Sequence, residues 1–215
     1  MAAPDPKDPD VVFGSQRSNV SRYDRRTAQT TLVGPDLSVT LPGGGAVNRN
    51  VRTMPLHFSP VDNSTMYYAQ NVVWKSTDGA HSWTRISPDL TRPTWEVPAT
   101  AGKYTGTVRV APAGSITALS PSPRSLGVIW VGTDDGQIQT TSDGGTTWRN
   151  VTPPGMKAWT RIFNIEAGHF DTRTAYAAAN TLRLDDINPH FFRTRDGGAT
   201  WTEINTGIAG GAVAN

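Results

Sequence analysis

The chain has 215 residues, a formal net charge of +2 and no cysteine. A chain of this length can bury a sizeable core in one domain. The absence of cysteine excludes disulfides and thiolate metal sites. The near-balanced charge gives no reason to expect a nucleic-acid partner, and no run of about 18 apolar residues could span a membrane. With 21 glycines, 16 prolines and 36% hydrophobic residues, the composition favours an all-β, turn-rich protein.

The first segment of the chain contains three short stretches that predict strands, over residues 11–14, 20–24 and 30–33. Asp24 stands at the turn between the second and third stretches. Because the first stretch follows the turn-like sequence of residues 6–10, we expect this segment to lack an innermost strand. A linker rich in glycine and proline follows it.

Further along the chain, one eight-residue pattern occurs three times, over residues 76–83, 141–148 and 194–201. In each copy a hydroxyl residue stands two positions before an aspartate, and a tryptophan stands five positions after it. The pattern assigns structural roles to Asp78, Trp83, Asp143, Trp148, Asp196 and Trp201. The Asp-Gly pair suits a hairpin turn, because glycine adopts positive φ and the carboxylate accepts hydrogen bonds from turn N–H groups. The tryptophan is then expected to begin the returning strand and to bury its ring under the hairpin.

The first copy departs from the other two, because Ala80 replaces the second glycine. We therefore expect a strained or rearranged turn there. The three copies are box 1, box 2 and box 3, in chain order.

Two apolar stretches separated by a polar turn precede each box, and a further strand runs into the box. With the strand that begins at the tryptophan, each unit is predicted to have four antiparallel strands. The box aspartates are 65 and 53 residues apart, a period typical of β-propeller blades. We expect an all-β propeller with blades at about 3–34, 51–88, 106–152 and 160–206.

The boxes resemble the Asp-box of bacterial neuraminidase-type repeats, and the sequence around them resembles bacterial sortilin-like and glycoside-hydrolase propeller proteins. This resemblance covers residues 3–215 and implies a larger propeller of which the chain is a fragment. A second possibility stays open, in which residues 211–215 supply the missing inner strand and close a four-bladed ring. Self-association through the terminal strands is a third expectation.

Blade topology predicts that function lies on the face opposite the boxes, because the loops there are free to lengthen. Two long linkers on that face carry Trp95, Tyr104 and Trp159. With His190 these rings are the predicted ligand-binding residues, as stacking platforms for sugars or as contacts for a protein. The alternative is that the rings fill gaps between blades.

Residues 180–190 are predicted to form the longest loop of the same face, with Asp185 and Asp186 at its tip. Glycosidases need two carboxylates, one protonated and one ionised. Asp185 or Asp186 paired with Asp134 is the best catalytic candidate, with Asp135 and Glu166 as further partners. A loop rich in oxygen ligands also suits Ca²⁺, although no metal site is indicated. The alternative is a solvated loop in which Asp185 pairs with Arg183.

The sequence favours a recognition scaffold that binds a glycan or a protein segment. The alternative is a glycoside hydrolase, similar to xyloglucanases or sialidases, that uses a pair of carboxylates. No cofactor is expected. The resemblance implies a secreted or periplasmic protein, but the first seven residues lack the pattern of a signal peptide, so the localisation stays open.

Overall fold

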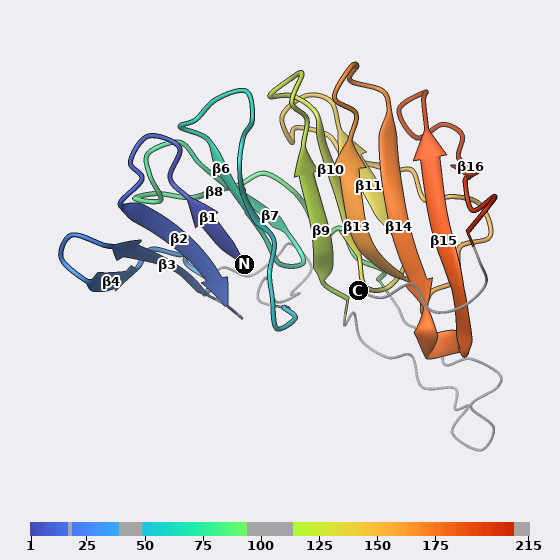
Figure 1. Ribbon diagram of the computed structural model, residues 1–215, viewed down its shortest axis with the longest axis horizontal. Helices are drawn as coiled ribbons and strands as arrows, with labels where there is room; N and C mark the ends of the chain where they lie inside the picture. The colour runs from blue at the N-terminus through green and yellow to red at the C-terminus, as the bar shows by residue number, and fades with distance from the viewer. Residues whose placement is uncertain (17–18, 39–48, 94–113, 209–215) are drawn as a thin grey trace.

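The computed structural model describes residues 1–16, 19–38, 49–93 and 114–208, which form four antiparallel sheets of four strands each (Figure 1). Sheet 1 contains β1 (Ala2–Pro4), β2 (Val11–Gln16), β3 (Asn19–Asp24) and β4 (Gln29–Leu32). Sheet 2 contains β5 (Leu56–Phe58), β6 (Met66–Ala69), β7 (Val73–Ser76) and β8 (Thr84–Arg85). Sheet 3 contains β9 (Ile116–Pro121), β10 (Ile129–Thr133), β11 (Ile138–Thr141) and β12 (Arg149–Asn150). Sheet 4 contains β13 (Arg161–Ala167), β14 (Ala175–Thr181), β15 (Asp186–Thr194) and β16 (Thr202–Glu203).

The prediction of an all-β chain is confirmed, because the only helical element of the described residues is a single 3₁₀ turn, η2 (Leu182–Leu184). In the same residues no helix is long and apolar enough to cross a membrane.

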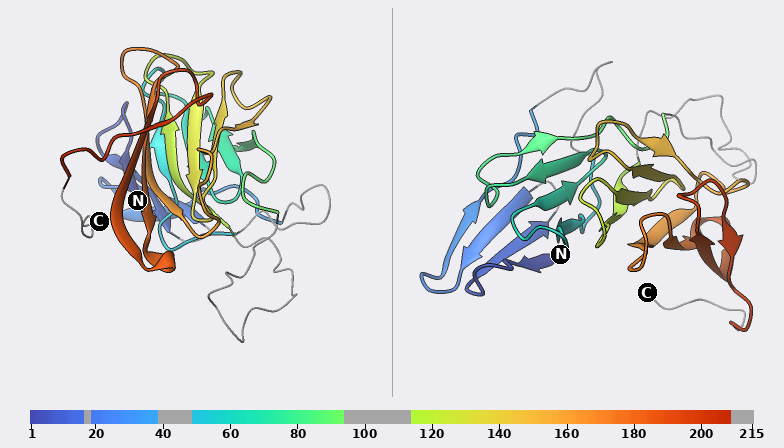
Figure 2. Two further views of the ribbon diagram at one scale, coloured as in Figure 1. Left: turned by 90° about the vertical axis from the view of Figure 1, so that its right-hand side faces the viewer. Right: turned by 90° about the horizontal axis from the view of Figure 1, so that it is seen from above.

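The four sheets stand side by side in chain order and form an arc, with sheets 1 and 4 at its two ends (Figures 1 and 2). Within each sheet the strands follow chain order, and the first strands of consecutive sheets contact one another. This arrangement places β1, β5, β9 and β13 on the inner side of the arc. The last strand of each sheet lies on the outer side.

The expectation that the first unit lacks its innermost strand is wrong. Ala2–Pro4 forms β1, and Ala3 pairs with Phe13 of β2. Pro4 is tolerated because it ends an edge strand, where its missing N–H removes no ladder hydrogen bond from a neighbour. The residues proposed to close the ring, 211–215, lie outside the described residues.

The core consists of three apolar layers, one between each pair of neighbouring sheets. One large ring from the second strand of the preceding sheet is buried in each layer. Phe13, Tyr67 and Trp130 are each 1% exposed. Burying a ring of this size stabilises the fold by about 1.5–3 kcal/mol, so these layers hold consecutive sheets together.

The three box turns share one hydrogen-bond pattern. In box 2 the Thr141 hydroxyl donates to Asp143 at 2.8 Å and accepts the Gly145 N–H at 3.0 Å. The other Asp143 oxygen accepts the Thr147 hydroxyl at 2.6 Å. Boxes 1 and 3 repeat these three bonds at distances of 2.5–3.0 Å. Ala80 therefore has the same place as Gly145 but with φ of 67°, so box 1 is strained rather than rearranged.

Each box tryptophan contacts the sheet that precedes its own, and not only its own hairpin. The indole N–H donates to a backbone carbonyl at the end of the preceding sheet, from Trp83 to Val33 at 2.6 Å, from Trp148 to Ile86 at 2.8 Å and from Trp201 to Val151 at 2.7 Å. The rings are half-buried. The repeated sequence thus joins neighbouring sheets as well as forming turns.

Candidate functional site

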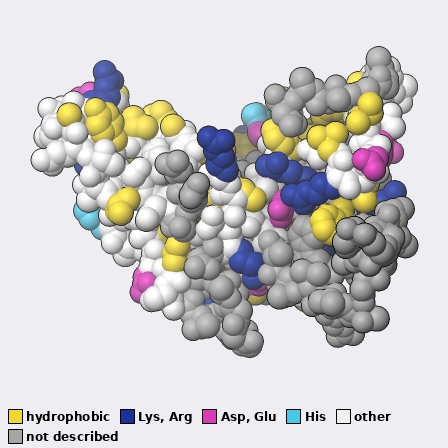
Figure 3. Space-filling model, turned by 90° about the horizontal axis from the view of Figure 1, so that it is seen from below, with side chains coloured by type: hydrophobic (Ala, Val, Ile, Leu, Met, Phe, Trp, Pro, Cys, Tyr) yellow, Lys and Arg dark blue, Asp and Glu magenta, His cyan; other side chains and the backbone are white. Residues whose placement is uncertain are grey.

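The connections between second and third strands lie on the face opposite the box turns, together with the linkers between sheets (Figure 1). We call this surface the loop face. Figure 3 shows basic side chains gathered near the middle of this face, with acidic side chains between them. Two predicted ligand-binding residues, Trp95 and Tyr104, lie outside the described residues. Trp159 lies in the linker between sheets 3 and 4 and is half-buried.

The segment predicted as a long loop, residues 180–190, is mostly strand. β14 continues to Thr181, β15 begins at Asp186, and these two residues pair with each other. Only η2 and Asp185 connect them. Asp185 ends η2 in a left-handed conformation, with φ of 57°, and is exposed. The lengthened hairpin thereby separates the two neighbouring aspartates, because Asp186 belongs to the strand and Asp185 to the turn.

Asp186, His190 and Glu203 form a cluster at this end of sheet 4. His190 Nε2 lies 2.9 Å from Asp186 Oδ2, and His190 Nδ1 lies 3.3 Å from Glu203 Oε1. Asp186 and His190 are four residues apart on one strand and therefore share a face of the sheet. Glu203 comes from the neighbouring strand β16. Both ring nitrogens can donate together only when the imidazole carries two protons.

The pKa of Asp186 is lowered to about 2. The largest cause is the hydrogen bond from the backbone N–H of Asn188, followed by the bond to His190. The Asn188 N–H donates at 3.0 Å and its side-chain amide donates to the same oxygen at 2.8 Å. Asp186 is therefore ionised at neutral pH, and its role is that of a hydrogen-bond acceptor or an anion rather than an acid.

A cavity of about 260 Å³ opens beside this cluster on the loop face. The linker residues 153–157 form one wall, and Thr160, Thr181, Asp186, His190, Phe192 and Glu203 form the rest. We call it the loop-face pocket. Lys157, Asp186, His190 and Glu203 provide polar groups, and Met156 and Phe192 provide apolar surface. Pockets of this composition bind small ligands or single side chains of a partner.

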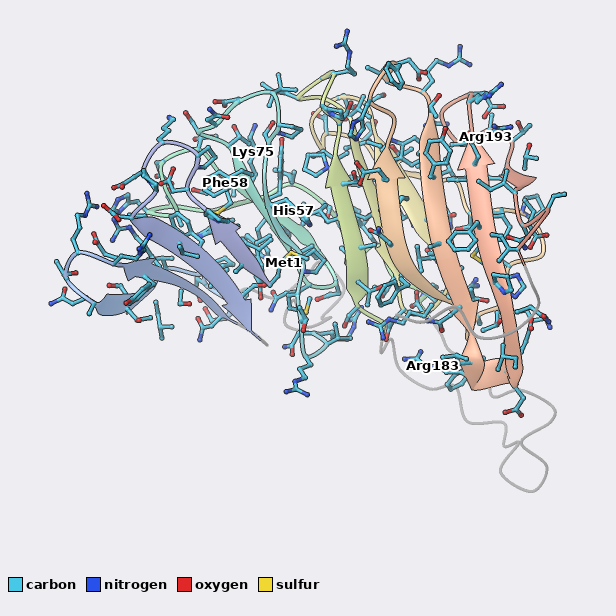
Figure 4. All side chains as sticks on the ribbon, in the orientation of Figure 1. Met1, His57, Phe58, Lys75, Arg183 and Arg193 are labelled. Atoms are coloured by element: carbon cyan, nitrogen blue, oxygen red, sulfur yellow. The ribbon has the colours of Figure 1, made fainter. Side chains whose placement is uncertain are left out.

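Asp134 lies away from this pocket, in the turn of sheet 3. It is buried, accepts the Ser115 N–H at 2.8 Å and contacts the Arg183 guanidinium at 3.5 Å. Arg183 also donates to the Asp134 carbonyl oxygen at 2.9 Å. Arg183 thus pairs with Asp134 and joins sheets 3 and 4. Figure 4 shows Arg183 at the loop-face end of sheet 4 and Arg193 near the other end of β15.

Asp135 is fully buried, and its pKa is raised because burial disfavours the charged form. Its carboxylate accepts the Thr133 hydroxyl at 2.5 Å and the Arg92 N–H at 2.8 Å. These contacts connect the linker that follows sheet 2 to the turn of sheet 3. Asp135 is therefore held inside the protein, where a ligand on the surface does not reach it.

Arg49 and Asp89 form a third pair on this face, and the sequence analysis did not identify it. Arg49 also donates to the Thr91 hydroxyl at 2.7 Å and to the Gly114 carbonyl at 3.2 Å. The Arg92–Asp135 and Arg183–Asp134 contacts connect neighbouring blades along the loop face, and the Arg49–Asp89 contact joins the two linkers on either side of sheet 2. Their partners are 40 or more residues apart, so no local pattern identifies them.

The remaining predicted partner, Glu166, lies near the box-turn end of β13 and contacts His169 at 2.8 Å. It pairs across the sheet with Tyr176, whereas Asp186 pairs with Thr181. The two carboxylates therefore belong to opposite ends of sheet 4. Among the described residues no group of three or more His, Asp or Glu side chains is arranged to hold a metal ion.

The fold is similar to solved β-propellers. The Dos1 propeller aligns over 98% of this chain and 49% of its own, with a TM-score of 0.57 and 15% identity. YCF48 from Cyanidioschyzon merolae aligns over 94% of this chain and 56% of its own, with a TM-score of 0.53 and 13% identity. An ancestral GH74 enzyme aligns over 99% of this chain and 32% of its own, with a TM-score of 0.50 and 15% identity.

The chain spans about a third to a little over half of the length of these three proteins. No protein-family model and no curated protein matches the sequence. At 13–15% identity the likeness shows the fold alone, and both enzymes and other proteins have this fold. The four sheets are blades of a β-propeller.

Proposed function

We propose that this chain is a recognition module that binds a glycan or a protein segment through the loop-face pocket. The observation that carries the proposal is the cluster of Asp186, His190 and Glu203 at an open cavity of about 260 Å³. Two carboxylates in one pocket accept hydrogen bonds from sugar hydroxyls, or from the ammonium or guanidinium group of a protein side chain. Met156 and Phe192 supply the apolar surface on which a sugar ring or an aliphatic stem rests.

The charge state of the loop-face carboxyls favours binding over hydrolysis. A glycosidase needs one carboxyl that is protonated near neutral pH beside one that is ionised. Asp186 is ionised, with a pKa of about 2. The carboxyl with a raised pKa, Asp135, is fully buried against Thr133 and Arg92. A glycoside hydrolase would need a protonated carboxyl at the pocket. Of these two carboxyls with shifted pKa values, Asp186 is at the pocket but ionised, and Asp135 is buried away from it.

A panel of β-glucan, xyloglucan, sialosides and a random peptide library, titrated against the wild type, tests the proposal. We expect saturable binding to one ligand class, weakened at least about tenfold in Asp186→Asn and in His190→Ala through the loss of charge-assisted hydrogen bonds. His169→Ala is the matched control, because it removes a ring paired with a carboxylate at the other end of the same blade.

Binding that persists in both pocket variants would contradict the proposal, as would an equal loss in His169→Ala. Release of reducing sugar by the wild type but not by Asp186→Asn would contradict the binding-module proposal and support glycoside-hydrolase activity. The absence of glycan binding together with peptide binding would assign the pocket to a protein segment.

A further inference from the structure

Every blade carries an aromatic residue at one equivalent position of its second strand. Each aromatic residue pairs with a residue of the third strand, and the paired residues occupy equivalent positions in the four blades. The pairs are Phe13 with Arg22, Tyr67 with Lys75, Trp130 with Thr140 and Tyr176 with Arg193. The first three rings are each 1% exposed, because the following blade covers them, whereas Tyr176 is 44% exposed. The sequence of blade 4 thus retains an aromatic side chain suited to an interface that the described chain does not cover.

A second feature also recurs in all four blades. The residue after the last strand is an aliphatic β-branched one whose N–H donates to a backbone carbonyl of the third strand. These bonds run from Val33 to Val20, from Ile86 to Val73, from Val151 to Ile138 and from Ile204 to Phe191, at 2.8–2.9 Å. The carbonyls of Val33, Ile86 and Val151 each accept a box tryptophan. All three box tryptophans are engaged in this way, and none of them donates to Ile204.

The turn of the following box fits closely against these residues. A Cβ on Gly145 would lie 2.5 Å from the Ile86 carbonyl oxygen, and a Cβ on Gly198 would lie 2.6 Å from the Val151 side chain. The acceptor position therefore fits a turn that has a glycine, or a residue as small as Ala80, three residues before the tryptophan. Blade 4 has the same backbone arrangement at Ile204.

The surface around Ile204 is hollow and partly apolar. A cavity of about 210 Å³ opens there, lined by Tyr176, Ala178, Phe191 and Ile204 among others. Phe163 belongs to β13, the strand next to β14, and is 40% exposed. We call this surface the outward face of blade 4. Phe192 borders both this cavity and the loop-face pocket, but it packs against the apolar layer between sheets 3 and 4. Tyr176 and Phe191 border this cavity and are not among the residues that line the loop-face pocket.

We propose that the outward face of blade 4 docks a further Asp-box blade, whose tryptophan donates to the Ile204 carbonyl. Three interfaces of the same kind already join consecutive blades in the molecule. A second copy of this chain fits less well. The blade that it would present is blade 1, which has no described blade before it. Blade 1 has no box, and no tryptophan follows Asp24 in its β3–β4 turn. Residues 209–215 contain no tryptophan.

The experiment uses the full chain with a duplicate of residues 160–206 attached behind it by a flexible linker that a specific protease cuts. The linker gives the added blade a high effective concentration before cleavage. We expect amide hydrogen exchange in β15 to slow by about tenfold or more when the added blade is present. After cleavage the added blade should co-elute with the chain in gel filtration.

Three variants test whether the docking is specific. Tyr176→Lys places a charge on the outward face and should abolish the protection and the co-elution. Tyr23→Lys is the matched control, because Tyr23 is similarly exposed, at 40%, on the opposite end blade. Replacing the tryptophan of the added blade by alanine should also release it.

Unchanged exchange in β15 would overturn the proposal. An equal effect of Tyr23→Lys, or retention of an added blade that lacks its tryptophan, would also overturn it. Separation of the added blade from the wild-type chain after cleavage would also overturn the proposal.

Discussion

Ala80 has a backbone conformation that boxes 2 and 3 give to glycine. Its φ is 67°, and its N–H makes the same bond to the preceding hydroxyl as Gly145 and Gly198 make. A residue with a Cβ is disfavoured there by about 1–2 kcal/mol. The hydrogen bonds of the box and the packing of Ala80, which is 3% exposed, impose the conformation.

Replacing Ala80 by glycine should therefore stabilise the protein. The relief of strain exceeds the added entropy of the unfolded chain, which is about 0.4–1 kcal/mol, so we expect a net gain of about 0.5–1 kcal/mol in the free energy of unfolding in urea. Ala199→Gly, in box 3, is the control, because Ala199 has no positive φ and should lose stability. A loss of stability in Ala80→Gly would show that box 1 is not strained.

The box aspartates should make the protein sensitive to acid. The pKa of each of Asp78, Asp143 and Asp196 is lowered to about 2, chiefly by a hydroxyl hydrogen bond from the residue four positions later. A carboxyl with a lowered pKa in the folded state stabilises the fold above its ordinary pKa, near 3.8, and that stability is lost as the pH falls toward 2.

We expect the free energy of unfolding to fall between about pH 4 and pH 2, measured by urea titration at a series of pH values. Asp143→Asn should be less stable at pH 6 and should lose less stability on acidification than the wild type. Parallel pH profiles for the two proteins would contradict the assignment.

At the scale of elements, the box tryptophans connect one blade to the preceding one. Trp148→Ala should cost about 3–5 kcal/mol, because the substitution removes a large half-buried ring from the layer between blades 2 and 3. Trp148→Phe retains most of the ring but loses the hydrogen bond to Ile86, so we expect a cost of about 1–2 kcal/mol. Urea unfolding of both variants measures the difference. Equal losses would mean that the hydrogen bond, and not the ring, carries the effect.

The repeated elements could be predicted because each box combines an Asp-Gly turn with flanking apolar strands. β1 was missed, because Ala2–Pro4 is short and contains a proline that usually argues against a strand. The sequence predicts a loop over residues 180–190, whereas the structure has strand there. Asn188 and Pro189 have low strand propensity, so the sequence does not reveal the start of β15. Pairing with β14 outweighs that preference.

The candidate site was only partly predictable for a related reason. Asp186 and His190 are on one strand, but residues four apart on a regular strand lie about 13 Å from each other. Their contact depends on the register shift between Ala179 and Thr181 in the pairing of β14 with β15. Glu203 joins them through the pairing of β15 with β16, and Arg92 reaches Asp135 from another blade. Contacts of this kind depend on how blades stack, which a single sequence does not specify.

At the scale of the whole molecule, the arc presents two different surfaces for recognition (Figure 2). The loop face has a polar pocket, and Arg–Asp pairs stiffen the joints between its blades. The outward face of blade 4 has aromatic side chains and an acceptor position like those between the other blades. Residues of β15 line both surfaces, because His190 and Phe192 border the loop-face pocket and Phe191 borders the cavity on the outward face.

The central claim is that ligands bind at the loop-face pocket, and the ring resonances of the four histidines test it directly by NMR. We expect a bound glycan or peptide to shift the His190 resonances saturably, because the ring lies between Asp186 and Glu203 at the pocket. His57, His81 and His169 lie elsewhere and should not move. Saturable shifts of His169 with none at His190, or ligand binding that leaves all four rings unchanged, would contradict the claim.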